Sequence, residues 1–233
     1  MKKAGIIGIV VVALLVVVGA YALAQNKAAV LGIGDAGNKV YGWRYKMTVS
    51  VETPEGLKTG SAVREVSVKF EPRAGYKPHP YHVTTKVKGE AVVVDLGERG
   101  VLFALIDPDD YRFVFEAFPG PPGLTLEGAE FYSSLVAGQK NLLEPDPKRN
   151  PRLAKFSNKN DYRTISLILP DELSSFYGMG VVLKEISVEI SNSPLTQKVD
   201  GYLPSYSDES GFGDWFRGLP YGDPRRIGVD SFK

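Results

Sequence analysis

Alternation of apolar and polar side chains recurs along this chain and constrains its fold more than any other feature. It is strongest over Val182 to Ile190, where every second residue from Ile186 onward is apolar. A period of two residues is typical of a strand that is buried on one face and solvated on the other. The same pattern predicts strands, joined in an antiparallel meander at the start, over Tyr45 to Val51, Val66 to Phe70, Val83 to Val87 and Ile165 to Leu169.

Two nearly continuous apolar runs, Glu90 to Leu96 and Val101 to Ile106, predict a central hairpin. Runs without polar alternation are expected of strands that are covered on both faces. The covers we expect are two helices that follow in the chain, Asp107 to Phe118 and Glu127 to Ala137. The aromatic residues at 111, 113 and 115 also fit a strand, so the first of these two segments has two interpretations.

Shorter elements complete the expected domain. Leu153 and Phe156 predict a short edge strand within a polar surface connection, and Asp171 to Tyr177, closed by Gly178, predicts a short helix. The predicted fold class is therefore α+β, mostly antiparallel β-sheet in a single domain over residues 41–203, with two or three short helices. An N-terminal hydrophobic helix is expected to precede it.

That hydrophobic segment, Ala4 to Leu23, holds twenty residues without a charge and follows Lys2 and Lys3. At about 1.5 Å per residue it spans a hydrocarbon core of roughly 30 Å, which predicts a single-pass inner-membrane anchor with the domain on the periplasmic side. A signal peptide cleaved after Ala24, which would leave the domain free in the periplasm, fits equally well. Residues 1–24 are the anchor or signal in either interpretation, and residues 25–40 are the linker.

The segment from residue 204 to 233 is rich in Gly, Ser, Asp and aromatic residues, which indicates a tail of doubtful order. Its candidate interaction residues are Trp215, Phe216 and Arg217, because these residue types dominate protein interfaces. A tail that lies over the domain's own sheet edge is the favoured alternative.

Composition excludes several classes of function. Without Lys2 and Lys3 the chain holds 26 basic and 27 acidic side chains, so no positive field would attract nucleic acid. The absence of cysteine excludes a disulfide scaffold, a thiol nucleophile, a Cys zinc site and a lipidated cysteine. Membrane attachment would then depend on Ala4 to Leu23.

Motifs with chemical meaning are few. Gly32 to Gly37 reads G-x-G-x-x-G, but a strand pattern follows it where a dinucleotide site needs a helix, so we expect no cofactor. His79 and His82 are weak metal candidates, because no third ligand accompanies them. Three aspartates, at 107, 109 and 110, are explained by helix capping more simply than by calcium binding.

Motifs of hydrolytic enzymes are absent as well. The sequence contains no G-x-S-x-G, S-x-x-K or H-E-x-x-H, and any triad assembled from distant residues would have to use His79 or His82. The first functional hypothesis is thus a non-catalytic cell-envelope binding or assembly module that engages a protein partner through a sheet edge or the tail. The alternative is a periplasmic, hydrolase-like enzyme that uses one of the two histidines.

Five segments of the sequence are similar to segments of a known protein family. They are Met47 to Ser61, Gly89 to Leu105, Phe115 to Pro119, Asp161 to Thr164 and Tyr177 to Ser193. Together they resemble an uncharacterised family of proteobacterial proteins with an N-terminal hydrophobic segment and a β-rich exported domain. The chain departs from that family's pattern with DYRT in place of D-P-R-T and LPSY in place of L-P-W-L. The family has no assigned activity, so the resemblance implies an exported single domain and no catalytic residue.

Overall fold

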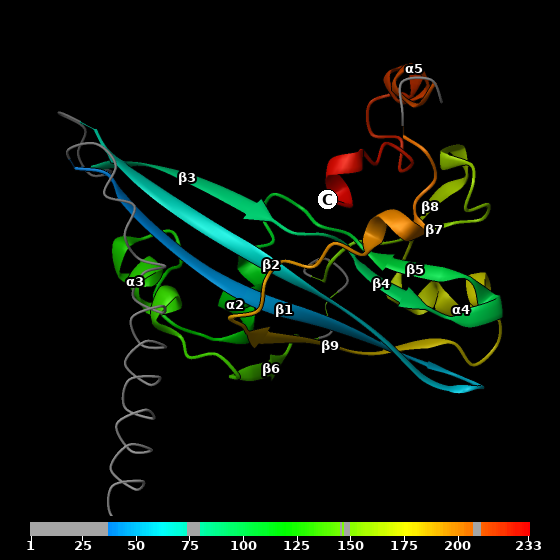
Figure 1. Cartoon of the computed structure of the whole chain (residues 1–233), viewed down its shortest axis with the longest axis horizontal. Coiled ribbons are helices and arrows are strands. Elements are labelled where there is room, and N and C mark those ends of the chain that lie inside the picture. The colour runs from blue at the N-terminus through cyan, green and yellow to red at the C-terminus, as the bar shows by residue number, and fades with distance from the viewer. Residues whose placement is uncertain (1–36, 74–79, 145, 147–149, 207–210) are drawn as a thin grey trace, which may run out of the picture.

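A long antiparallel hairpin, β1 (Lys39–Thr53) and β2 (Gly56–Pro72), runs the length of the molecule in the computed structural model (Figure 1). The structure describes residues 37–73, 80–144, 146, 150–206 and 211–233. Pro54 and Glu55 form the turn, and the Thr53 hydroxyl donates to the Gly56 carbonyl at 2.7 Å. This side-chain hydrogen bond lies next to the turn and helps to fix the register of the two strands.

The hairpin forms the centre of a five-stranded sheet in the order β3-β2-β1-β9-β6. Its other strands are β3 (Tyr81–Lys88), β9 (Val182–Ile190) and β6 (Lys140–Leu142), all antiparallel to their neighbours. Alternate side chains of β1 are buried, so the predicted half-buried strands are confirmed. The predicted β3-β2-β1 meander is confirmed as well.

A second, four-stranded sheet has the order β4-β5-β7-β8. Its strands are β4 (Val92–Asp95), β5 (Val101–Ala104), β7 (Leu153–Phe156) and β8 (Ile165–Ile168). The prediction of β7 as an edge strand was wrong, because β7 pairs with β5 on one side and with β8 on the other. Alternation along one strand reports which face is buried and carries no information about how many neighbours the strand has.

The two sheets pack face to face through the inner face of the hairpin. Gly60 of β2 marks the closest approach, since a Cβ atom at that position would lie 1.9 Å from the Val93 carbonyl oxygen of β4. Only glycine allows this backbone contact. The core between the sheets includes Met47, Val49 and Ala62 of the hairpin and Val92, Val94 and Leu102 of the small sheet.

Two helices cover the rest of the large sheet's inner face. They are α2 (Arg112–Ala117) and α3 (Leu126–Ser134), so the helical interpretation of both segments is confirmed. Trp43 of β1 packs against Phe115 and Tyr132, and the Asn141 amide of β6 donates to the Ala117 carbonyl at 2.8 Å. The expectation that these helices cover the β4-β5 hairpin was wrong, because their aromatic residues pack on β1.

The β4-β5 hairpin is nevertheless covered on both faces, as predicted. One face packs on the large sheet, and the other is covered by the C-terminal part of the chain, which contributes Val199, Ile227 and Phe232 to a second apolar cluster. This part contains the short helices η4 (Val199–Tyr202), α5 (Phe212–Gly218) and η6 (Val229–Ser231). Figure 1 shows it above the small sheet, in orange to red.

Four short elements lie in the connections: the first joins β4 to β5, the second joins β7 to β8, and the last two lead from β8 to β9 of the large sheet. They are η1 (Gly97–Arg99), η2 (Tyr162–Thr164), η3 (Pro170–Glu172) and α4 (Leu173–Tyr177). Together the described residues form an α+β fold, mostly antiparallel sheet with a few short helices. In the part of the chain that the structure describes, no helix combines the length and apolar character needed to cross a bilayer. The segment Ala4 to Leu23 lies outside the described residues.

Candidate functional site: the free edge of the large sheet

The first candidate site is the pair of histidines, His79 and His82. His82 is exposed on the outer face of β3, opposite Glu71 of β2, and His79 lies outside the described residues. Lys69 lies 2.8 Å from the Glu71 carboxylate and holds its pKa below the usual range. Within the described part of the chain, His82 makes no hydrogen bond to a hydroxyl group.

The three aspartates are each paired with an arginine. One oxygen from each of Asp107, Asp109 and Asp110 lies within 4.8 Å of the other two. Asp107 binds Arg152 through both oxygens, Asp109 lies 3.4 Å from Arg112, and Asp110 lies 2.5 Å from Arg64. Each carboxylate therefore has a guanidinium partner, while the Oδ1 atom of Asp110 is buried without a hydrogen bond to any described residue. The capping interpretation was wrong, because α2 begins at Arg112, its N-cap residue is Tyr111 and no described side chain caps it. The pairing with arginine gives these aspartates a structural role instead.

Arg64 is the most unusual side chain in the core, because it is fully buried. Its Nε donates to the Glu90 carbonyl at 3.1 Å, and its Nη2 donates to the carbonyls of Ala104 and Leu105 at 3.0 and 3.2 Å. The Glu90 carboxylate accepts in turn from the backbone N–H groups of residues 198 and 199. Burial raises the pKa of Asp110 to about 7, although Arg64 acts in the opposite direction. The network joins β2 to the segment before β4, to the end of β5 and to the segment before α2.

The candidate interaction residues of the tail contact the chain itself. Trp215 packs against Tyr162 at 5.3 Å between ring centroids, and the tilted rings of Phe216 and Phe212 lie 5.6 Å apart. Arg217 is exposed and pairs with Asp214 at 2.6 Å, three residues earlier on the same helix. The two aromatic rings are thus half-buried in intramolecular contacts, which leaves less of their surface for a partner.

A depression of about 560 Å³ lies beside this C-terminal part. Asp200 and Lys233 both line it, and their charged groups pair at 2.5 Å. Its remaining lining includes Leu203, Tyr206 and Val229. The two charges pair with each other at the exposed rim of this depression.

The free edge of β3 is the feature that offers a binding function. Among the described residues, β3 pairs with β2 on one side and has no backbone partner on the other (Figure 1). The other outer strands of the two sheets are shorter, since β6 has three residues and β4 and β8 have four each. With eight residues, β3 is the longest of the outermost strands in the described part of the chain.

The phase of the hydrogen bonding shows which groups of β3 face outward. The Arg73 N–H donates to the Pro80 carbonyl at 2.8 Å, which makes residues 73 and 80 a hydrogen-bonded pair in the β2-β3 register. Antiparallel pairs alternate, so the even-numbered residues of β3 face β2. The N–H and C=O groups of Tyr81, Val83, Thr85 and Val87 therefore point toward the free edge.

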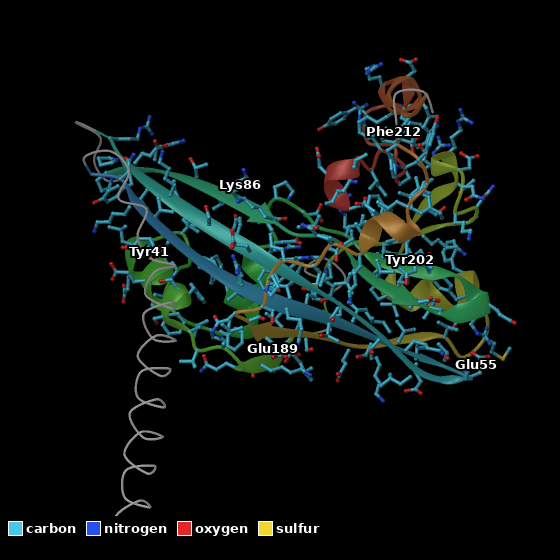
Figure 2. The ribbon with its side chains drawn as sticks, viewed as in Figure 1. Tyr41, Glu55, Lys86, Glu189, Tyr202 and Phe212 are labelled. Atoms are coloured by element: carbon cyan, nitrogen blue, oxygen red, sulfur yellow. The ribbon has the colours of Figure 1, made fainter. Side chains whose placement is uncertain are left out.

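The two faces at this edge differ in chemistry. Tyr81, Val83 and Val87 lie half-buried on the inner face and pack against the core, where the Tyr81 ring meets Phe70 edge-on at 6.0 Å. The outer face of β3 carries His82, Thr84, Lys86 and Lys88, all exposed. Figure 2 labels Lys86 on this strand. The sequence pattern located the strand, but the only hint of a free edge was its pair of lysines, which natural edge strands commonly carry.

These observations define the protein as an α+β domain of two packed antiparallel sheets with one long, unpaired edge. No family model and no curated protein matches the chain. Comparison with solved structures finds DynF from the dynemicin biosynthesis pathway of Micromonospora chersina, 13% identical over 74% of this chain and 87% of that chain, with a TM-score of 0.25. A likeness at this level supports no statement about fold or function.

Proline substitutions at two neighbouring threonines test which N–H groups of β3 point toward β2 and which point toward the free edge. Thr84→Pro removes an N–H that faces β2, and we expect it to lower the free energy of unfolding by about 2 kcal/mol. Thr85→Pro removes an N–H that faces solvent, where proline is tolerated, and we expect a loss of about 1 kcal/mol or less. Urea unfolding of both variants measures the difference. Equal losses would contradict the phase derived from Arg73 and Pro80.

Proposed function

We propose that this protein is a non-catalytic binding module that captures an extended segment of another protein along β3. The single observation that carries the proposal is the unpaired edge of β3, with four residues whose backbone groups point outward. A strand added to such an edge gains main-chain hydrogen bonds without any catalytic group. The three clustered aspartates are each already paired with an arginine, which makes them a weaker candidate for a binding site.

A second copy of the chain is the less suitable occupant. Two β3 edges paired with each other would bring two rows of His82, Lys86 and Lys88 together on the same face. Like charges across neighbouring strands are destabilising. We therefore assign the edge to a different protein.

The proposed location is the periplasmic side of the inner membrane. The sequence supports it through Ala4 to Leu23, which would either anchor the domain or be removed after Ala24. The proposed partner is accordingly an envelope protein.

Site-specific crosslinking of the full-length protein in cells tests the capture. A photoreactive residue in place of Thr84, on the edge strand, should give a crosslinked product with one other protein. The matched control replaces Thr48, a threonine on the outer face of β1 that has β2 on one side and β9 on the other, and should give none. Adding Thr85→Pro should abolish the product at position 84, because it removes an outward N–H group.

The outcomes separate clearly. A product that survives both Thr85→Pro and a second outward substitution, Val87→Pro, would show contact without strand pairing and overturn the proposal. A product with the mass of two copies of this chain would overturn the assignment to a different protein. Absence of any product at position 84 would count against the edge as a binding site.

A further inference from the structure

We infer that the captured segment alternates apolar and acidic residues, with the acidic side chains on the outer face of the sheet. This inference rests on the proposed function and names the chemistry of its partner. An added strand continues the two faces of the sheet, so its alternate residues face different surroundings. Those surroundings can be read from the side chains of β3 and β2.

The outer face at the edge has positive charge in excess. Glu65 and Glu71 of β2 are both on this face, and each already has a cation nearby. Arg44 lies 2.7 Å from the Glu65 carboxylate, and Lys69 lies 2.8 Å from the Glu71 carboxylate. The carboxylates of β2 are therefore neutralised before the lysines of β3 are considered.

The two lysines of β3 lack such close partners. Lys88 approaches Glu65 only to 3.9 Å, and Lys86 makes no ion pair with any described residue. Lys86 lies opposite Ser67 in the β2-β3 register, which offers no charge. An acidic side chain on the added strand would be the nearest carboxylate to Lys86.

Strand geometry brings that carboxylate close. Residues opposite Lys86 and Lys88 on the free side would form non-hydrogen-bonded pairs, because the hydrogen-bonding groups at the edge belong to the odd-numbered residues. Side chains in non-hydrogen-bonded pairs lie closer together, with Cα atoms about 4.5 Å apart. Opposite charges at this spacing favour pairing, and like charges oppose it.

The inner face of the sheet favours apolar residues at the remaining positions of the captured segment. Residues of the added strand opposite Tyr81, Val83 and Val87 would share the inner face and extend the apolar surface that packs on the core. A charged residue there would lose hydration without a partner. Apolar residues at every second position are thus required on one face, and acidic residues are favoured on the other.

Synthetic peptides of the same eight-residue length as β3 test this inference on the full-length protein. The first alternates valine with glutamate, the second alternates valine with lysine, and the third has the composition of the first with its valines and glutamates in separate blocks. We expect the acidic alternating peptide to bind about tenfold more tightly than the basic one in low salt. The preference should shrink as salt rises, because exposed charges are screened.

Charge reversal on β3 provides the matched test. In the Lys86→Glu, Lys88→Glu variant, we expect the order of the two alternating peptides to reverse. Thr85→Pro should weaken binding of both peptides, because it acts on the backbone and leaves the charges unchanged. Thermal unfolding of each variant shows that the fold is retained.

The results distinguish the inference from the function it rests on. If acidic and basic alternating peptides bind equally and Thr85→Pro weakens both, the edge captures strands and the inferred acidic pattern is wrong. If the block peptide binds as well as the acidic alternating peptide, or if Thr85→Pro has no effect, strand capture itself is wrong.

Discussion

Replacing Arg64 with methionine should lower the free energy of unfolding by about 3–5 kcal/mol, the cost of leaving a buried charge without its partner. The guanidinium group is fully buried and connects β2, the end of β5 and the Asp110 segment through four hydrogen bonds. Methionine fills much of the same volume and satisfies none of these acceptors. Urea unfolding of the variant and the wild type measures the loss.

Two controls show whether the loss of stability comes from the buried charge pair or from replacing any arginine. Arg44→Met removes a partly exposed arginine from the outer face of β1, where its pair with Glu65 is solvated, and should cost about 1 kcal/mol or less. Arg64→Met combined with Asp110→Leu removes both charges and should be less destabilising than the sum of the two single variants. Strict additivity would contradict a coupled pair.

The pH dependence of Arg64→Met follows from the pKa of Asp110. Burial raises this pKa to about 7 in the folded wild type, and Arg64 limits the rise, so its removal moves the pKa upward. A carboxyl group whose folded pKa is raised contributes stability below its unfolded pKa of about 4 and loses it as pH rises through the folded value. In the wild type, the loss of stability levels off above about pH 7. In the variant it continues to higher pH, because the folded-state pKa of Asp110 is higher there. The deficit of the variant should thus be larger at about pH 9 than at about pH 6.

Arg64 also illustrates what the sequence could and could not predict. It stands in the alternating row of Ala62, Val66, Val68 and Phe70, and a period of two places it on the inner face with them. That position was a readable signal of a buried arginine. Its partner was not readable, because Asp110 is far along the chain and meets Arg64 only after β4 and β5 pack on β2.

The strands were predictable for a related reason. Burial of one face imposes alternation locally, so β1 and β9 are visible in short windows of sequence. Strand order is set by pairing between distant segments, which is why β7 was assigned to an edge although β8 lies beside it. For the same reason the free edge of β3 could be identified only from the structure, since the sequence of Tyr81 to Lys88 does not indicate whether a neighbouring strand is present.

The C-terminal segment was predicted to lie over a sheet edge, whereas it covers one face of the small sheet. Its residues follow no period, so the sequence did not indicate which surface they cover. The C-terminal segment contacts the sheet through single apolar anchors, such as Val199, Ile227 and Phe232, separated by glycine, proline and polar residues. A pattern of this kind resembles a weakly ordered tail in composition. Burial of individual anchors, rather than a repeating face, holds it in place.

Phe232 is the anchor whose loss should have the largest effect, although it is the penultimate residue of the chain. Its ring is fully buried and lies 5.4 Å from Phe103 and 5.7 Å from Phe156 between centroids. Its carbonyl oxygen accepts from the Ala91 N–H at 2.8 Å. Phe232→Ala should lower the free energy of unfolding by about 3–5 kcal/mol, because it opens a cavity among these rings.

The matched control is Tyr221→Ala, which removes a fully exposed aromatic ring from the same segment and should change stability by about 0.5 kcal/mol or less. Hydrogen exchange locates the effect, since the amides of Ala91 and Ile106 donate to the carbonyls of Phe232 and Ser231. In Phe232→Ala these two amides should exchange faster than those at the centre of β1. If both aromatic variants cost equally little, the C-terminal segment would contribute nothing to the cooperative core, and the cover assigned to the β4-β5 hairpin would be wrong.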